Sequence, residues 1–286
     1  MSARLTQAPF DAPLARRLAE PRQPGATFYW LGQAGFVIDI GRHRLVIDPY
    51  LSDTLGKKYF QSPFPHTRMM PAPIAVEDLR GIDLVLCTHQ HTDHMDPGTL
   101  APLAASHPQL RFVVPRACLS QARERIGVAD DRLVALDAGD RAEPLPGLNI
   151  HAVRAAHETL ERDEGGRHRF LGYVIEAEGL RLFHSGDCIP FDGQREEIAS
   201  FDIDLGLLPV NGRSDQLRQA GFAGNFSLTE ALALCEACGI PAMLAHHYGM
   251  FAFNTADPSV IDAAASAAPL QLVRAETKVA YRLAFG

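Results

Sequence analysis

The stretch THQHTDHMD, residues 88–96, holds three histidines and two aspartates within nine residues. It follows a short apolar run, 82–87, that predicts a buried strand. It precedes Pro97, which is typical of the first turn of a helix capped by Asp96. Functional sites of α/β proteins form at the carboxyl ends of strands. A metal-free surface turn is the alternative, but the strand before the stretch and the helix after it favour a metal site.

The spacing H-x-H-x-D-H in this stretch suits more than one metal ion. In an extended segment, residues i and i+2 point the same way, so His89 and His91 can share one ion. Asp93 and His94 then lie on the turn into the helix and face a neighbouring point. Imidazole and carboxylate ligands suit zinc, manganese or iron. We therefore predict one or two divalent ions, zinc or manganese, with iron also acceptable.

Two ions need ligands from other segments, and polar residues follow several other predicted strands. These are Asp48 after 44–47, His157 after 151–156, Asp187 in the segment His184-Ser185-Gly186-Asp187, and His246 or His247 after 243–245. Each alone could be a satisfied loop or core residue. Their shared position at strand ends predicts that they meet at one edge.

The chain organisation indicates a single domain. Residues 1–25 are rich in Pro, Ala and Arg and predict an N-terminal arm over the surface, and residues 26–286 predict one domain. In each half of that domain, predicted hairpins come first and strand–helix alternation follows, which indicates two sheets inside and helices outside. The irregular loop 51–75 is long enough to suggest a functional role.

Composition restricts the class of protein. Of the 286 residues, 47% are hydrophobic and 21% charged, which excludes wholesale disorder, and the net charge of −7 gives no general attraction to nucleic acid or anionic membranes. Five scattered cysteines do not form a disulfide pattern, and Cys235-x-x-Cys238 lies in an apolar helical run that favours packed thiols over a zinc or redox site. Without an apolar leader or a membrane-length segment, we expect a cytoplasmic protein.

Residues 27–286 resemble the metallo-β-lactamase superfamily of hydrolases. The H-x-H-x-D-H motif is the most specific match, and Asp48, His157, Asp187 and the histidine at 246/247 match the other four motif positions in order. The resemblance implies an α/β fold, a four-layer αββα sandwich with its metal site at one edge between the sheets. The segments LGQAGF (31–36), HSGD (184–187) and HYGMF (247–251) are most similar to the branch that contains L-ascorbate-6-phosphate lactonase.

The resemblance also implies a role for each site residue. The first metal would be bound by His89, His91 and His157, the second by Asp93, His94 and His247, and Asp187 would bridge the two. His247 is preferred to His246 because the family ligand directly precedes the Tyr-Gly turn. Asp48 would orient a ligand histidine from outside the coordination sphere. His184 would act in the same way or be a packed core histidine.

A bound metal ion lowers the pKa of its water, so hydroxide is available at neutral pH. We therefore predict a hydrolase in which this hydroxide attacks a carbonyl or phosphorus centre of the substrate. Asp93 would be a metal ligand or would orient the water and pass on its proton. The favoured substrate is a lactone or other small ester, with or without a phosphate group. The candidates for binding an anionic substrate, equally compatible with a solvated surface, are Lys57, Lys58, Arg68, Asn211 and Arg213.

Two alternatives remain at this point. One is a phosphodiesterase or nuclease that uses the same metal site, although the acidic chain lacks an evident nucleic-acid module. The other is a non-catalytic metal-binding regulatory protein, although its ligand set is complete. We expect a small-molecule partner, no nucleic acid and no membrane, and the sequence is compatible with a homo-oligomer.

Overall fold

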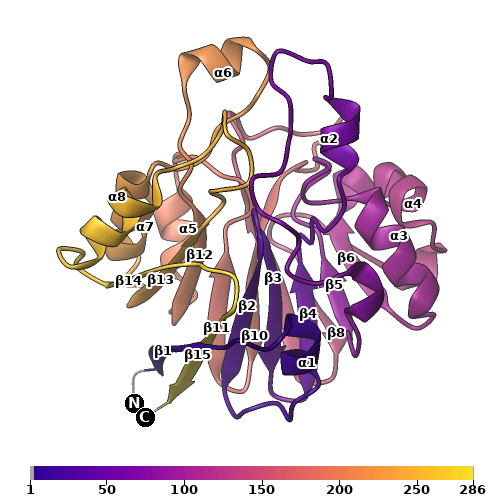
Figure 1. Ribbon diagram of the computed structural model, residues 1–286, viewed down its shortest axis with the longest axis horizontal. Coiled ribbons are helices and arrows are strands. Elements are labelled where there is room, and N and C mark those ends of the chain that lie inside the picture. Colours follow the sequence, from indigo (N-terminus) through magenta and orange to yellow (C-terminus); the bar gives the residue numbers. More distant parts are fainter. Residues whose placement is uncertain (1–2, 286) are drawn as a thin grey trace.

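Two facing β-sheets form the centre of the computed structural model, which describes residues 3–285 (Figure 1). Within those residues the first sheet has eight strands in the order β1-β15-β2-β3-β4-β5-β6-β7. Their bounds are β1 (Ala3–Pro9), β2 (Ala26–Gly32), β3 (Gly35–Ile40), β4 (His43–Ile47), β5 (Leu84–Leu86), β6 (Arg111–Pro115), β7 (Leu133–Leu136) and β15 (Val279–Phe285).

The second sheet has seven strands among the described residues, in the order β14-β13-β12-β11-β10-β9-β8. Their bounds are β8 (Arg141–Leu145), β9 (Leu148–Arg154), β10 (Leu171–Ala177), β11 (Leu180–His184), β12 (Leu205–Pro209), β13 (Ala242–His246) and β14 (Gln271–Arg274). In both sheets an antiparallel part is followed by a parallel part, β4 to β7 in the first and β11 to β14 in the second. Each sheet therefore presents a row of carboxyl ends at one edge.

Helices cover the outer faces of the two sheets and complete the predicted αββα sandwich (Figure 1). On the first sheet lie α3 (Pro97–Ser106) and α4 (Leu119–Ile126), and on the second lie α5 (Gln194–Ala199), α7 (Leu228–Ala237) and α8 (Pro258–Ala265). The shorter helices are α1 (Leu14–Leu18), α2 (Thr54–Lys58) and α6 (Asp215–Gln219), and the 3-10 turns are η1 (Val76–Asp78), η2 (Arg116–Cys118) and η3 (Asp130–Arg132). Helices α2 and α6 stand at the same end of the sandwich.

Local sequence signals set the ends of these helices. The Asp96 carboxylate accepts a hydrogen bond from the backbone N–H of Gly98 (3.0 Å), which caps α3. The Ser227 hydroxyl and the Glu230 carboxylate form a capping box at the start of α7. Gly127 ends α4 with a φ of +72°, a conformation that glycine adopts without steric cost.

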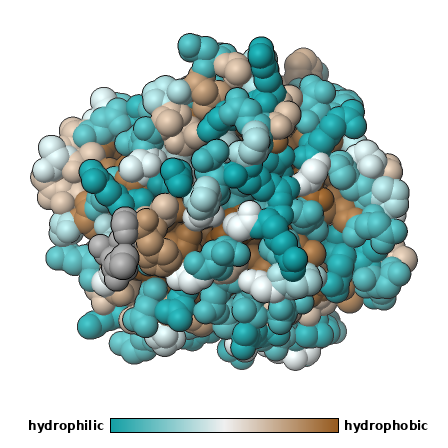
Figure 2. Space-filling model, turned by 90° about the horizontal axis from the view of Figure 1, so that it is seen from below, coloured by the Kyte–Doolittle hydropathy of each residue, from teal (hydrophilic) through white to brown (hydrophobic). Residues whose placement is uncertain are grey.

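The core lies between the sheets and beneath the outer helices. Large aromatic side chains such as Trp30, Phe36 and Phe183 are buried in the layer between the sheets, whereas Val85 and Phe112 belong to a second cluster under α3 and α4. Cys235, on α7, is buried in the first cluster, where burial raises the pKa of its thiol. The end of the sandwich opposite α2 and α6 has a mostly hydrophilic surface (Figure 2). No helix among residues 3–285 is long and apolar enough to cross a membrane.

The N-terminal segment differs from the predicted arm, because its described part joins the first sheet. Strand β1 pairs antiparallel with β15, and Leu5 is 1% exposed. Leu14 and Leu18 of α1 are buried beneath the same sheet. Only one side chain of β1 is buried, so the strand carries little of the alternation by which strands are recognised. Strand β8 was not predicted either. It contains Pro144, and proline within a sheet is confined to edge strands, of which β8 is one.

Candidate metal centre

The carboxyl ends of strands from both sheets bring the predicted ligands together at the end of the sandwich that carries α2 and α6 (Figure 1). The residues follow β4, β5, β9, β11 and β13 along the chain, and they are Asp48, the segment 89–94, His157, Asp187 and His247 respectively. A rigid strand thus precedes each of them, which is the arrangement that fixes ligand positions most precisely.

The first group of potential ligands is His89, His91 and His157, whose ligand atoms lie within 4.8 Å of one another. The Nδ1–H of His157 donates to the backbone carbonyl of Gly224 (2.9 Å), so the lone pair of its Nε2 is free for a metal. Burial lowers the pKa of His157 to about 4 and that of His89 well below its ordinary value. Both rings are therefore neutral at pH 7, the state in which imidazole binds metals.

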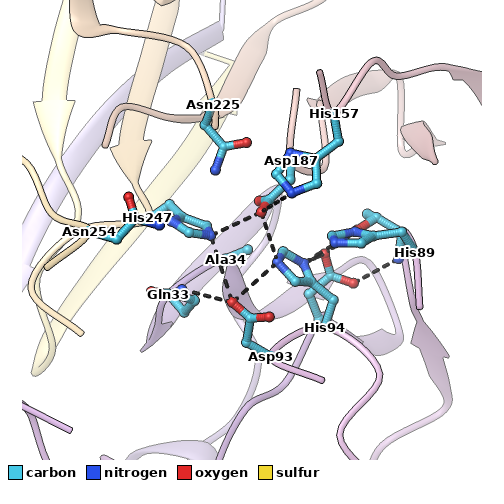
Figure 3. Close-up of polar contacts among 12 residues, drawn as sticks. Gln33, Ala34, His89, Asp93, His94, His157, Asp187, Asn225, His247 and Asn254 are labelled. Atoms are coloured by element: carbon cyan, nitrogen blue, oxygen red, sulfur yellow. Dashed lines mark hydrogen bonds and ion pairs between the residues drawn. The ribbon is translucent and has the colours of Figure 1, made fainter. Parts of the chain in front are cut away.

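The second group is Asp93, His94 and His247, again with ligand atoms within 4.8 Å of one another. The Nδ1–H of His94 donates to the carboxylate of Asp48 (2.7 Å), which also accepts from the N–H and hydroxyl of Thr88. Asp48 thereby fixes the ring so that Nε2 faces Asp93 and Asp187 (Figure 3).

Asp187 lies between the two groups. One of its carboxylate oxygens is 3.2 Å from Nε2 of His94, 3.2 Å from Nε2 of His247 and 3.8 Å from Nε2 of His157 (Figure 3). Burial alone would raise the pKa of Asp187, but the neighbouring His247 and His94 outweigh it and hold the pKa well below its usual range. Burial alone would lower the pKa of His94, but Asp187 and Asp48 raise it well above its ordinary value. The cluster therefore concentrates negative charge where a cation would sit.

Unpartnered polar atoms test whether divalent ions fit this cluster. Among the described residues, Nε2 of His89 and one oxygen of Asp187 are buried without a hydrogen-bond partner, and Nε2 of His94 and Nε2 of His247 meet only carboxylate oxygens of Asp93 and Asp187. Such atoms each cost about 1–3 kcal/mol when nothing satisfies them. Neutral imidazole nitrogens and carboxylate oxygens are the donor set of zinc and manganese sites. The residues present fit one or two such ions.

Gln33 supports both groups and was not predicted as a site residue. Its side-chain Nε2 donates to Asp93 (2.8 Å). Its backbone carbonyl accepts from the backbone N–H of His247 (2.9 Å) and from the indole N–H of Trp30 (3.0 Å). Gln33, Asp48 and His247 all have positive φ, at +51°, +45° and +62°. Such strained backbone is concentrated at functional sites. The sequence signal was the LGQAGF segment, which contributed only to the resemblance.

The two other candidate histidines lie outside these groups. The ring of His184 donates to the carbonyl of Ala34 (2.9 Å) and accepts from the N–H of Gly186 (3.1 Å), so it secures the turn that leads to Asp187. His246 is fully buried and stacks on His184 with ring centroids 5.0 Å apart. Of the pair 246/247, only His247 has its ligand atom in a group.

A cavity of about 390 Å³ lies over the cluster. Its floor includes His91, Asp93, His157, Asp187 and His247. Its wall includes five aromatic rings, namely Tyr59, His66, Phe222, Phe251 and Phe253. The size is in the range of small-molecule sites.

Most of the predicted substrate-binding residues do not line this cavity. Lys58 does, whereas the neighbouring Lys57 does not. The guanidinium of Arg68 donates to the backbone carbonyls of Tyr50 (3.1 Å), Ser52 (3.0 Å) and Met70 (3.2 Å), so it holds the loop together instead of facing a substrate.

Arg213 and Asn211 support the cavity from outside. Arg213 forms a two-pronged pair with Glu230 (2.6 and 2.7 Å). The amide of Asn211 accepts from Asn225 (3.0 Å) and donates to the side-chain oxygen of Asn254 (2.8 Å). Asn254 lines the cavity and was not predicted, because nothing in the sequence distinguishes it from other loop asparagines.

A family model described as "Beta-lactamase superfamily domain" matches residues 43–248. This range includes all the residues of both groups. The chain belongs to the metallo-β-lactamase superfamily.

Curated relatives of this superfamily member differ in their named activities. A UPF0173 metal-dependent hydrolase of Hyperthermus butylicus is 25% identical over 236 residues, which are 80% of this chain and 86% of the relative. A probable L-ascorbate-6-phosphate lactonase of Salmonella gallinarum is 26% identical over 212 residues, 69% of this chain and 57% of the relative. An N-acyl-phosphatidylethanolamine-hydrolyzing phospholipase D of Caenorhabditis elegans is 26% identical over 192 residues, 63% of this chain and 52% of the relative.

Solved structures share the fold at low sequence identity. A possible metal-dependent hydrolase of Veillonella parvula superposes with a TM-score of 0.72 at 14% identity and covers 90% of this chain and 98% of its own. An isothiocyanate hydrolase from Delia radicum gut bacteria superposes with a TM-score of 0.69 at 16% identity and covers 87% of this chain and 94% of its own. These similarities concern the fold alone.

Proposed function

We propose that this protein is a metal-dependent hydrolase that cleaves a carboxylic ester, with a lactone or other small ester as substrate. The observation that carries the proposal is the position of Asp187 between two groups of ligand atoms at the floor of the cavity. The names of the metal-dependent hydrolase and lactonase relatives support it. We assign the residues of the first group to one ion, Asp93, His94 and His247 to a second, and Asp187 to both.

Zinc or manganese bound by these residues would supply Lewis acidity, which lowers the pKa of water and neutralises charge that develops on the ester oxygen. We assign Asp93 the task of orienting the attacking water and accepting its proton. The hydrogen bond from Gln33 supports this role, because it limits rotation of the carboxylate. The water oxygen bonds to the carbonyl carbon, the carbon–oxygen ester bond breaks, and the water proton passes to the leaving oxygen. A lactone then yields a single hydroxy acid.

The test is acid release from a panel of lactones and open esters by protein loaded separately with zinc and with manganese. Asp187→Ala is measured in parallel. Metal-dependent turnover that the variant lacks is the expected result. A wild-type protein that binds metal but cleaves no ester in the panel would overturn the proposal.

A phosphodiester substrate is the second candidate, supported by the similarity to the nematode phospholipase D. The same panel separates the two candidates when it includes bis(p-nitrophenyl) phosphate and a glycerophosphodiester. Ester hydrolysis predicts a higher kcat/KM for the lactones than for either phosphodiester. The reverse order would assign the site to phosphoryl transfer.

A further inference from the structure

The aromatic wall of the cavity, defined as Tyr59, His66, Phe222, Phe251 and Phe253, is assembled from three separate segments. Tyr59 and His66 follow α2, Phe222 follows α6, and Phe251 and Phe253 follow β13. All three segments lie at the end of the sandwich where the candidate metal ligands meet (Figure 1). Residues so distant in sequence gather around one space only through the fold, so the wall is a built feature of the cavity.

The rings of the wall pack on one another around His66. The centroid of His66 is 4.2 Å from that of Tyr59 in a stacked arrangement and 4.8 Å from those of both Phe251 and Phe253. Phe222 is 5.2 Å from Phe253. These separations are those of favourable aromatic pairs, so the wall is held in place before a ligand arrives.

The wall carries no charge. Burial lowers the pKa of His66, and its Nδ1–H donates to the carbonyl of Phe64 (2.9 Å), so the ring is neutral at pH 7. Phe222 and Phe253 are only half-buried although they belong to this cluster. Their accessible faces border the cavity, and an apolar ligand would remove that surface from water.

Cationic groups around the cavity are few. Lys58 and Arg125 are the lysine and arginine side chains that line it within the described part of the chain. The guanidinium of Arg125 is bonded to the backbone carbonyls of Gln90 and Met95, and Lys58 is exposed to solvent. A phosphate placed against the wall would lose hydration and would meet one available charged donor, Lys58, where phosphate sites provide two or more.

We infer that the substrate bears an apolar group of the size of an aryl ring beside its scissile bond, and that the aromatic wall binds this group. The inference rests on the proposed ester hydrolysis, whose substrate class it narrows from small esters in general to aryl or bulky apolar esters and lactones. The wall is then the feature that determines specificity, whereas the floor performs the chemistry. A phosphorylated sugar lactone is not the substrate that this cavity favours.

The experiment measures binding and turnover separately, on full-length protein loaded with zinc. Calorimetry compares phenylacetate, acetate and 2-phosphoglycolate, which share a carboxylate and differ in the attached group. Kinetics compare a γ-phenyl with a γ-methyl butyrolactone. The variants are Phe222→Ala and Phe253→Leu, and the matched control is Phe60→Ala, since Phe60 is 77% exposed and does not line the cavity.

Wild-type protein is expected to bind phenylacetate about 10-fold more tightly than acetate, because burial of one ring is worth at least that factor. Phe222→Ala and Phe253→Leu should reduce this preference, and the phenyl-to-methyl ratio of kcat/KM, by about 5-fold or more. Phe60→Ala should leave both ratios unchanged. If one variant fails to fold, the affinities of wild-type protein for the three ligands still test the inference.

Two results would overturn the inference. Equal affinity for phenylacetate and acetate would show that the wall contributes nothing, and tighter binding of 2-phosphoglycolate, lost in Lys58→Ala, would show that the site selects phosphate. The results that would overturn the proposed function are different from these. Phenylacetate bound through the wall by a protein that cleaves no ester would leave the inference standing, and ester turnover without any aryl preference would leave only the function standing.

Discussion

The floor and the wall of the cavity are built by different means. The floor residues follow β-strands of both sheets, are mostly buried, and are fixed by hydrogen bonds such as those from Gln33 to Asp93 and from His157 to the carbonyl of Gly224. The wall residues lie on connecting segments and hold one another by ring packing. If the proposals above hold, rigid strands support the chemistry, while connecting segments, which tolerate change, carry the selectivity.

The largest expected effect comes from the centre of the floor. Asp187→Ala removes the carboxylate that lies between the two groups, so we expect kcat/KM to fall about 1000-fold or more and metal content to drop. Assays on zinc- and manganese-loaded protein, with elemental analysis of bound metal, measure both quantities.

The matched control is Asp202→Ala, because Asp202 is another acidic residue but its side chain is 88% exposed and does not line the cavity. It should keep full activity and metal content. A fully active Asp187→Ala variant would mean that the floor does not perform the chemistry.

The wall is expected to show its effect in stability. Phe251 is 3% exposed and packs against Tyr50 and Leu55 as well as the other rings. Phe251→Ala should lower the free energy of unfolding by about 3 kcal/mol through lost burial and the remaining cavity. Urea denaturation measures this, with Phe60→Ala as control at about 0.5 kcal/mol or less. Equal effects of the two variants would mean that the wall is not a packed unit.

The clustering of the candidate metal ligands could be predicted from the sequence because its information is local. The spacing of His89, His91, Asp93 and His94 is contained in six residues, and the remaining candidate ligands each follow an apolar strand. The predicted αββα sandwich is confirmed, since strand and helix signals such as Asp96 before Pro97 agree with the tertiary structure.

The wall and the support of the loops could not be predicted, because they depend on contacts between distant segments. Phe222 and Phe253 read as ordinary loop residues until the fold brings their rings to 5.2 Å. Arg68 and Arg213 were candidates for binding an anionic substrate because of their charge and their loop positions, with a solvated surface as the alternative. The structure pairs Arg68 with backbone carbonyls and Arg213 with Glu230, and these distant partners cannot be identified from the sequence alone.

Gln33 lies beside the floor. Its side chain donates a hydrogen bond to Asp93, and its backbone carbonyl accepts one from the backbone N–H of His247. Gln33→Ala should lower kcat about 10-fold while KM and metal content stay nearly constant, since it positions a carboxylate and is not itself a ligand. Steady-state kinetics with elemental analysis test this, and the exposed Gln23→Ala is the control. A loss of metal in Gln33→Ala would instead make Gln33 part of the support of metal binding.

The smallest effect concerns the support behind the wall. Arg213 pairs with Glu230 at the start of α7 and donates to the backbone carbonyl of Asn225 (3.2 Å), three residues from Phe222. Arg213, and then Ser227, hold the pKa of Glu230 at about 2, below its ordinary value of 4.5. Because the pKa is depressed in the folded state, the charge stabilises the protein above pH 4.5, and this stabilisation is lost as the pH falls toward 2.

Glu230→Gln should therefore lower the free energy of unfolding by about 1 kcal/mol at pH 7, with a difference that shrinks below pH 4.5. Urea denaturation at pH 7, 4 and 3 measures this, and Glu236→Gln, at the exposed end of the same helix, is the control. If this pair also holds the loop that carries Phe222, the variant should reduce the preference for phenylacetate over acetate without changing metal content. A change in metal content would show that floor and wall are coupled and would remove the distinction between them.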